Sequence, residues 1–281
     1  MSDLFERVLD PQTVQAAWRR LRSDRAPWAH DVTREELDAE LPRHLLQLIA
    51  DLRDERYRPA ALRQFTVARG DGKKRVISAQ FLRDKLAQRM VLEVLEAEID
   101  PLLHPDSFGY RRGRGVPHAI AKVRERIATG LRWVVDGDIR SFFDRVPHRG
   151  INRAVAEFVP NRALRRLIKR WVAASPHPGG LLSPAVGVPQ GAVLSPMLCN
   201  LFLDQLDSAW TRAGIPFVRY ADDFVLLTPS RNDAERALEF TGRKLRGLRL
   251  ELHPDKTRIA QATPSLRFLG EPIVKKRWRR S

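Results

Sequence analysis

Phe217-Val-Arg-Tyr-Ala-Asp-Asp-Phe-Val-Leu-Leu227 places two adjacent carboxylates, Asp222 and Asp223, between two short apolar runs. The apolar flanks predict two short strands, although Asp is disfavoured in strands and adjacent carboxylates repel each other. A hydrated turn can hold such a pair, but this turn lacks the Gly or Asn that tight hairpins favour. A divalent cation also relieves the repulsion, because hard cations prefer carboxylate and phosphate oxygens. On this pair alone, a hydrated turn and a metal site both remain open.

A third carboxylate follows another apolar run. Residues 133–135 predict a buried strand; Asp136 comes directly after them, and Asp138 follows two residues later. Three carboxylates on neighbouring strands can hold two cations, which stabilise the attacking and leaving oxygens of an in-line phosphoryl displacement. Asp136 and Asp138 share one face of a strand because side chains alternate with period two, so spacing leaves the choice between them open.

Helical patterns surround these strands. A hairpin is predicted at residues 63–67 and 75–77, around Gly70-Asp-Gly72, and short strands are predicted near Leu250 and Phe268. The predicted helices cover residues 12–21, 37–52 (after the capping box Thr33-Arg-Glu-Glu36), 81–103, 117–130, 149–174 and 195–214, with another helix from Asn232. This order predicts an α+β fold with the sheet in the second half of the chain.

Composition narrows the class of protein. The chain has 281 residues, 50 Lys and Arg against 34 Asp and Glu, and a net charge of +16, which suggests a polyanionic partner. The last run, Lys275-Lys-Arg-Trp-Arg-Arg280, adds cations around an indole that can stack on a base, although a solvated tail remains the alternative.

One cysteine, Cys199, excludes an intramolecular disulfide and a multi-cysteine zinc site. With no apolar run of membrane length and no signal-peptide pattern at Met1, we expect a cytoplasmic protein without a membrane partner.

Tyr220-Ala-Asp-Asp223 resembles the signature of reverse transcriptases of the bacterial group II intron type. Six further blocks follow that family's order between about residues 15 and 274: Gly72-Lys-Lys-Arg-Val-Ile77, Phe108-Gly-Tyr-Arg-Arg-Gly-Arg114, Asp138-Ile-Arg-Ser-Phe-Phe-Asp144, Val188-Pro-Gln-Gly-Ala-Val-Leu-Ser-Pro196, Leu252-His-Pro-Asp-Lys-Thr257 and Phe268-Leu-Gly270. The family's first metal ligand aligns with Asp138, so the resemblance favours Asp138 over Asp136.

The resemblance implies the fingers and palm of a right-hand polymerase, with the palm built from an antiparallel sheet and packed helices. Residues 1–130 are expected to form a mainly helical N-terminal region and fingers, and 131–274 the palm. Fingers elements are expected to interleave at about 147–185, and 275–281 form a basic tail.

The resemblance also implies roles for individual residues. Asp138, Asp222 and Asp223, with the Ile139 carbonyl, are expected to bind two Mg²⁺ ions, for which Mn²⁺ can substitute. Phe143 is expected to exclude a 2′-hydroxyl; without the motif it would be read as a core aromatic. The residues expected to bind dNTPs are Lys74, Arg75, Phe143, Gln190, Gly191 and Lys256. Those expected to contact nucleic acid are Arg111, Arg112, Arg114, Lys275, Lys276, Arg277, Arg279 and Arg280.

The pattern departs from intron-encoded enzymes after the palm. Only about ten residues follow Phe268-Leu-Gly270, so we expect a missing thumb or a protein or structured-RNA partner that supplies its function. Compact enzymes of this kind resemble stand-alone reverse transcriptases of bacterial defence, including those beside CRISPR adaptation modules.

The sequence therefore predicts an RNA-directed DNA polymerase that extends a DNA or RNA primer on an RNA template with dNTPs. A bacterial defence or mobile-element complex is the expected setting. The alternative is a non-catalytic, maturase-like RNA-binding subunit of a ribonucleoprotein, and the intact set of three carboxylates argues against it.

Overall fold

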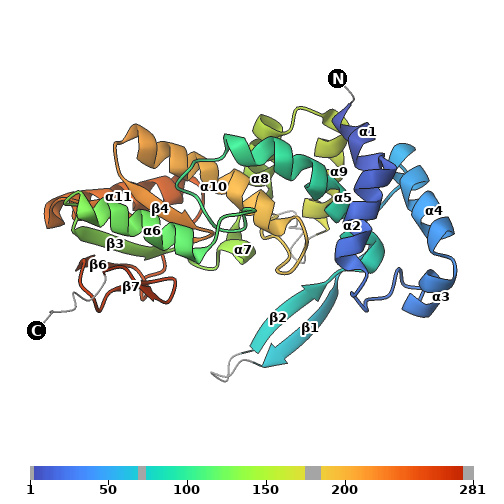
Figure 1. Ribbon diagram of the computed structural model, residues 1–281, viewed down its shortest axis with the longest axis horizontal. Helices are drawn as coiled ribbons and strands as arrows, with labels where there is room; N and C mark the ends of the chain where they lie inside the picture. The colour runs from blue at the N-terminus through green and yellow to red at the C-terminus, as the bar shows by residue number, and fades with distance from the viewer. Residues whose placement is uncertain (1–2, 69–73, 175–184, 275–281) are drawn as a thin grey trace, which may run out of the picture. The chain divides into compact units, whose positions relative to one another are not determined.

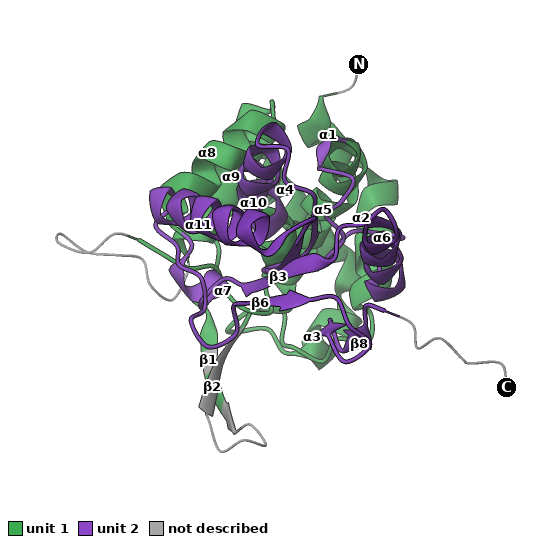
Figure 2. Cartoon of the chain, turned by 90° about the vertical axis from the view of Figure 1, so that its left-hand side faces the viewer, with its two compact units in different colours: residues 1–101, 147–198 green, residues 102–146, 199–281 purple. Residues whose placement is uncertain are grey.

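The computed structural model describes residues 3–68, 74–174 and 185–274 (Figure 1). The chain forms two compact units, each made of two separate segments (Figure 2). Unit 1 contains residues 1–101 and 147–198, and unit 2 contains residues 102–146 and 199–281. Residues 102–130, which the sequence analysis assigned to the N-terminal region, thus belong to the same unit as the strand at 133–138.

Unit 1 consists mainly of helices and one hairpin. Its elements are α1 (Leu4–Leu9), α2 (Pro11–Leu21), α3 (Arg34–Ala39), α4 (Leu41–Arg53), β1 (Arg63–Ala68), β2 (Lys74–Ala79), α5 (Leu82–Ile99), α8 (His148–Phe158), α9 (Arg162–Ala173) and the start of α10 (Ser195–Arg212). The hairpin prediction is confirmed, since β1 and β2 pair antiparallel; its turn lies outside the described residues.

Local sequence signals explain where these helices begin and end. Asp10 caps α2, its carboxylate accepting from the Gln12 N–H at 2.8 Å. The capping box of Thr33 and Glu36 is present at the start of α3. The prediction of one helix over 37–52 is wrong, because the chain bends at Glu40 and α4 begins anew with a proline in its first turn, where no backbone N–H is needed.

Unit 2 is built around a four-stranded sheet with strand order β4-β5-β3-β6 and only antiparallel pairs. Its elements are α6 (Val116–Ala128), β3 (Trp133–Asp138), α7 (Phe142–Arg145), the rest of α10, β4 (Phe217–Tyr220), β5 (Asp223–Thr228), α11 (Arg231–Gly247), β6 (Arg258–Gln261), β7 (Arg267–Phe268) and β8 (Glu271–Pro272). The strand predicted near Leu250 is instead a single bridge between Leu252 and Ile139, and the edge strand β6 begins later.

Both faces of the sheet are covered. Val134 and Val225 pack with Ile120 of α6 in one buried cluster. On the opposite face the Trp210 ring of α10 lies 4.9 Å from that of Phe224, and α11 contacts β3 and β5. The apolar middle of the sheet is therefore enclosed, and its polar side chains gather where β3 ends and β5 begins.

None of the described helices is both long and apolar enough to span a bilayer.

Candidate active site

The three predicted carboxylates meet at one end of the central strand pair. Asp138 is the last residue of β3 and Asp223 the first of β5, and the two are directly opposite in the antiparallel register. Opposite residues in such a ladder project on the same face, with Cβ atoms about 5 Å apart. Asp222 precedes Asp223 in the turn between β4 and β5. Asp136 lies two residues further from the turn, where it pairs with Val225 on β5 and Arg258 on β6.

The turn that carries Asp222 is conformationally demanding. Tyr220 pairs with Asp223, so only Ala221 and Asp222 make the connection. Ala221 has a φ of 58°, in the left-handed region that favours glycine. A neighbouring loop passes so close that a Cβ added to Gly109 would lie 2.3 Å from the Ala221 nitrogen. Surrounding contacts must therefore hold this turn in a conformation that its own sequence disfavours.

Charge is concentrated at the carboxylates. Burial, followed by repulsion from Asp222 and Asp138, raises the pKa of Asp223 to about 6. Burial also raises the pKa of Asp222, and Asp138 adds to that effect. Burial and mutual repulsion destabilise the ionised carboxylates, and a bound cation would offset both effects.

Two cationic side chains from the end of the chain reach these acids. Lys256 Nζ lies 2.5 Å from Asp138 Oδ2, and this hydrogen bond raises the pKa of Lys256. Arg258 is the residue opposite Asp136 in the β3–β6 ladder, and its guanidinium lies 3.1 Å from the Asp136 carboxylate. The structure thus brings Lys256, which the sequence predicts to bind dNTPs, into contact with Asp138.

The donor set suits a hard divalent cation. Within the described ranges, no group of three His, Cys, Asp or Glu side chains is arranged so that it could hold a metal ion. The carboxylate oxygens of Asp138, Asp222 and Asp223 are nevertheless the ligands that Mg²⁺ prefers, and an ammonium group already lies against Asp138. Ile139 is fully buried, and the bridge to Leu252 uses the Asp138 carbonyl and the Arg140 N–H rather than the Ile139 carbonyl.

The raised pKa predicts that Asp223→Asn stabilises the metal-free protein. An acid whose pKa is higher in the folded than in the unfolded state destabilises the fold above that pKa, and the penalty disappears once both states are protonated. A shift from 3.8 to about 6 corresponds to about 3 kcal/mol, which solvent screening reduces to about 1–2 kcal/mol.

Denaturant unfolding in EDTA checks this prediction. The gain from Asp223→Asn should be largest at pH 7 and should fade as the pH falls through 6 towards 4. Asp31→Asn, at an exposed carboxylate in unit 1, is the control and should show no such gain. A stability loss for Asp223→Asn at pH 7 would contradict the electrostatic description.

Phe143 belongs to an aromatic cluster near the carboxylates. It is half-buried on α7, and its ring centroid lies 5.6 Å from that of Phe142 and 6.4 Å from that of Tyr110. Tyr110 is itself half exposed, and burial followed by the charge of Asp222 raises its pKa. Phe143 is therefore held in place by packing while part of its ring reaches the surface.

A buried arginine, which sequence reasoning missed, supports the β4–β5 turn. The fully buried Arg219 on β4 forms a two-pronged ion pair with Asp207 of α10, at 2.7 and 2.5 Å. The same guanidinium donates to the Ala221 carbonyl at 3.0 Å and to Asn200 at 2.9 Å. A charged residue inside the apolar run Phe217-Val-Arg-Tyr was the available signal, but its partner lies 12 residues away on another element.

Asn200 extends this support to the loop beneath the turn. Its side-chain amide donates to the Gly109 carbonyl at 2.8 Å. Arg219, Asp207 and Asn200 together therefore link α10, the 108–110 loop and the β4–β5 turn through buried hydrogen bonds.

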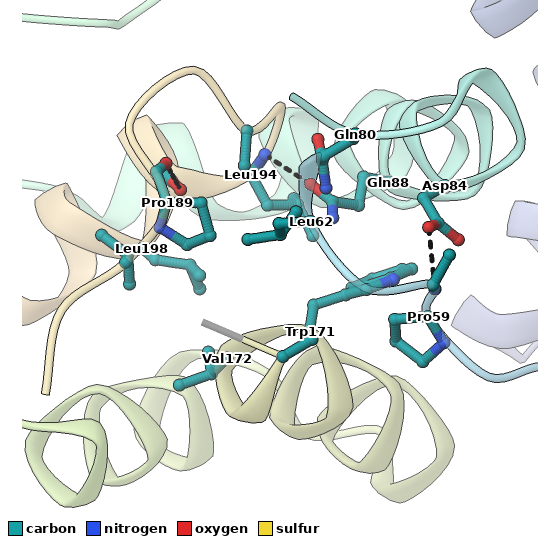
Figure 3. A pocket seen from close by; sticks show the side chains of 15 residues that line it. Pro59, Leu62, Gln80, Asp84, Gln88, Trp171, Val172, Pro189, Leu194 and Leu198 are labelled. Carbon is teal, nitrogen blue, oxygen red and sulfur yellow. Dashed lines mark hydrogen bonds between the residues drawn. The ribbon is translucent and has the colours of Figure 1, made fainter. Parts of the chain in front are cut away.

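In unit 1, hydrogen bonds to neighbouring side chains hold the loop at 188–194, which carries Gln190 and Gly191 (Figure 3). A small pocket lined by Trp171, Pro189 and Leu198, among other residues, lies beside it. Two buried glutamines face this loop: Gln88 accepts from the Leu194 N–H at 3.1 Å and Gln80 from the Val193 N–H at 3.4 Å. Gly191 has a φ of 94°, which glycine adopts without strain.

The other predicted contact residues have differing environments. The buried Arg111 guanidinium donates to the carbonyls of His104 and Ser107, at 2.7 and 2.8 Å, and so stabilises its own loop. Arg114 donates to the Pro105 carbonyl, and Arg112 is exposed. Lys74 and Arg75 lie on β2, where the description covers the backbone only. Lys275, Lys276, Arg277, Arg279 and Arg280 lie outside the described residues.

Comparison with known proteins identifies the family. Residues 67–273 match the model of the family described as reverse transcriptase (RNA-dependent DNA polymerase), and the chain belongs to this family. It is 29% identical to Protein YkfC of Escherichia coli (strain K12), over 98% of this chain and 84% of that protein. It is 26% identical to the group II intron-encoded protein LtrA of Lactococcus lactis, over 87% of this chain but only 41% of LtrA.

A solved structure shows the same fold. Telomerase from Candida albicans, in complex with the TWJ fragment of telomeric RNA, superimposes with a TM-score of 0.59 at 13% identity, over 85% of this chain and 50% of that one. The predicted α+β fold with polymerase fingers and palm is thus confirmed, and so is the prediction of an RNA-directed DNA polymerase. Enzymes of this family use divalent metal ions.

Proposed function

We propose that this chain extends the 3′ end of a DNA or RNA primer with dNTPs, copying an RNA template, and that its carboxylates carry the chemistry. The observation that supports this proposal most is the register of β3 and β5, which places Asp138 opposite Asp223 beside the turn residue Asp222. Acids of raised pKa gathered at one end of a buried sheet are typical of a site that binds cations.

In this proposal Asp138, Asp222, Asp223 and the Ile139 carbonyl hold two Mg²⁺ ions, for which Mn²⁺ can substitute. When bound, the ions lower the pKa of the primer 3′-hydroxyl and neutralise the pyrophosphate leaving group. In the proposed reaction the ammonium group of Lys256, whose raised pKa keeps it protonated, leaves Asp138 and gives a proton to the pyrophosphate leaving group. Lys74 and Arg75 offer charges to the triphosphate, and Gln190 and Gly191 position the nucleotide or template.

Template-dependent addition tests the proposal. The protein, with Mg²⁺ and an annealed RNA template and DNA primer, is given each dNTP separately. We expect addition of the nucleotide complementary to the template base, loss of addition in EDTA, and its return with excess Mg²⁺. Stable binding of the primer–template without any addition in Mg²⁺ or Mn²⁺ would instead support the non-catalytic, RNA-binding alternative.

The setting proposed for this activity is a ribonucleoprotein of a bacterial mobile element or defence system, in which a protein or structured RNA assists the polymerase. Similarity to an intron-encoded protein of Lactococcus lactis supports a mobile-element origin. Sequencing of the RNA that co-purifies with the protein tests this: an enriched structured RNA is expected, and a random sample of cellular RNA would contradict it.

Phe143 is proposed to select deoxyribonucleotides. Its ring is fixed against Phe142 and Tyr110, so it cannot easily move aside for an extra oxygen on the sugar. We expect Phe143→Val or Phe143→Ala to raise the ratio of rNTP to dNTP incorporation efficiency by about 10- to 100-fold, as pocket changes of this size do elsewhere. Phe240→Val, at a half-buried phenylalanine of α11 outside this cluster, is the control. An unchanged ratio in the Phe143 variants would make Phe143 a packing residue only.

A further inference from the structure

Helix α9 separates its charges from its apolar side chains more completely than the other described helices. Its 12 residues, Arg162–Ala173, include five basic and no acidic side chains. One side of the helix is buried and consists of Leu164, Leu167, Ile168, Trp171 and Val172. All five cations fall on the opposite side. The first is Arg162, and the other four follow it after three, four, seven and eight residues, which is the spacing of one helix face.

Two of these cations are used within unit 1. Arg166 pairs with Glu55, and Arg170 donates to the carbonyls of Glu55 and Tyr57. The other three are Arg162, Arg165 and Lys169. In the part of the chain that the structure describes, none of the ion pairs involves them.

Helix α11 in unit 2 shows the contrasting arrangement. It also carries five basic residues, but three acids are interspersed with them. Arg231 pairs with Glu235, Arg236 with Asp233 and Arg243 with Glu239. In α11, three of the five cations are thus paired with acids of the same helix. Helix α9 has no acid, so its cations have no such partner within the helix.

Three unneutralised cations on one helix face repel each other, at a cost of a few tenths of a kcal/mol for each close pair. They extend over about 10 Å of helix, since each residue adds about 1.5 Å. A polyanion with closely spaced charges removes the repulsion and releases condensed counterions when it binds. Because the chain belongs to a family of RNA-dependent polymerases and has a net charge of +16, RNA is the polyanion that fits.

We propose that the face of α9 formed by Arg162, Arg165 and Lys169 binds the phosphate backbone of RNA, independently of sequence, as a site separate from the carboxylates of unit 2. Only the choice of RNA as the polyanion rests on the family to which the chain belongs. It does not depend on the carboxylates being catalytic.

The test is the salt dependence of RNA affinity. A fluorescein-labelled, mixed-sequence, single-stranded RNA is titrated with full-length protein in EDTA, between about 50 and 200 mM salt. Arg162→Gln/Arg165→Gln/Lys169→Gln should reduce the slope of log affinity against log salt by about 2, since each phosphate contact contributes about 0.7. Gln preserves helix propensity, and thermal unfolding verifies that the variant is folded.

Arg231→Gln/Arg236→Gln/Arg243→Gln is the matched control, because it removes the same charge from exposed positions that are already paired. Its slope should stay within about 0.5 of that of the wild-type protein. Equal slopes for the α9 variant and the wild-type protein, or equal reductions in both variants, would overturn the proposal, the latter by showing an effect of net charge alone. An affinity that falls by the same factor at every salt concentration would also overturn it, since lost phosphate contacts must change the slope.

Discussion

Asp222→Asn is expected to reduce the rate of templated dNTP addition by about 10³-fold, because a metal ion at the reacting phosphate supplies several kcal/mol and each 1.4 kcal/mol is tenfold in rate. Asp222 lies in the two-residue turn, where the charge of Asp138 raises its pKa and that of Lys256 lowers it. Asn keeps one side-chain oxygen, but it lacks the negative charge and the second oxygen of Asp222, so two cations would be held by only two carboxylates. Asp223→Asn should have an effect of similar size.

The measurement is single-turnover addition of one nucleotide to a primer annealed to RNA, at saturating protein. Affinity for the primer–template should remain within about threefold, since the change removes a negative charge rather than a phosphate contact. Asp204→Asn, at a half-buried carboxylate of α10 outside the site, is the control. Addition by Asp222→Asn at a rate close to that of the wild-type protein would refute the assignment of this site.

Arg219→Met is expected to lower the free energy of unfolding by about 3–5 kcal/mol, because it leaves the fully buried Asp207 carboxylate without its partner. It also removes the hydrogen bond to the Ala221 carbonyl, so the strained turn that carries Asp222 loses a restraint. Folded variant protein at low temperature should therefore add nucleotides more slowly and need more Mg²⁺ for half-maximal rate.

A double variant separates the two effects. Arg219→Met/Asp207→Leu removes both charges and should recover much of the lost stability, since a buried ion pair is often replaceable by apolar side chains. It cannot restore the bond to Ala221, so its requirement for Mg²⁺ should stay high. Arg231→Met, at an exposed pair with Glu235, should change stability by less than about 0.5 kcal/mol. A normal Mg²⁺ requirement in the double variant would limit Arg219 to a structural role.

Local patterns made much of the site predictable. The acidic pair between apolar runs predicted the β4–β5 hairpin, and the apolar run before Asp138 predicted β3. Both predictions depend only on short apolar runs, which lie within a few residues of sequence. Sequence spacing left Asp136 and Asp138 equivalent. Their cross-strand partners differ, however, and partners depend on the register between strands far apart in the chain.

The features that sequence did not reveal depend on distant contacts. The Arg219–Asp207 pair forms only when α10 packs beside β4. The membership of residues 102–130 in unit 2 likewise depends on contacts with segments far away in the chain. The break between α3 and α4 is of a different kind. The apolar spacing continues through it, and the proline at the start of α4 outweighs that periodicity.

The central claim is that chemistry occurs at Asp138 opposite Asp223, and the most direct test compares Asp138→Asn with Asp136→Asn. Both acids lie on the same face of β3, and each binds a cationic side chain. In single-turnover addition on an RNA template with Mg²⁺, Asp138→Asn should lose about 10³-fold in rate and Asp136→Asn less than about tenfold. Equal losses in the two variants, or the larger loss in Asp136→Asn, would contradict the account.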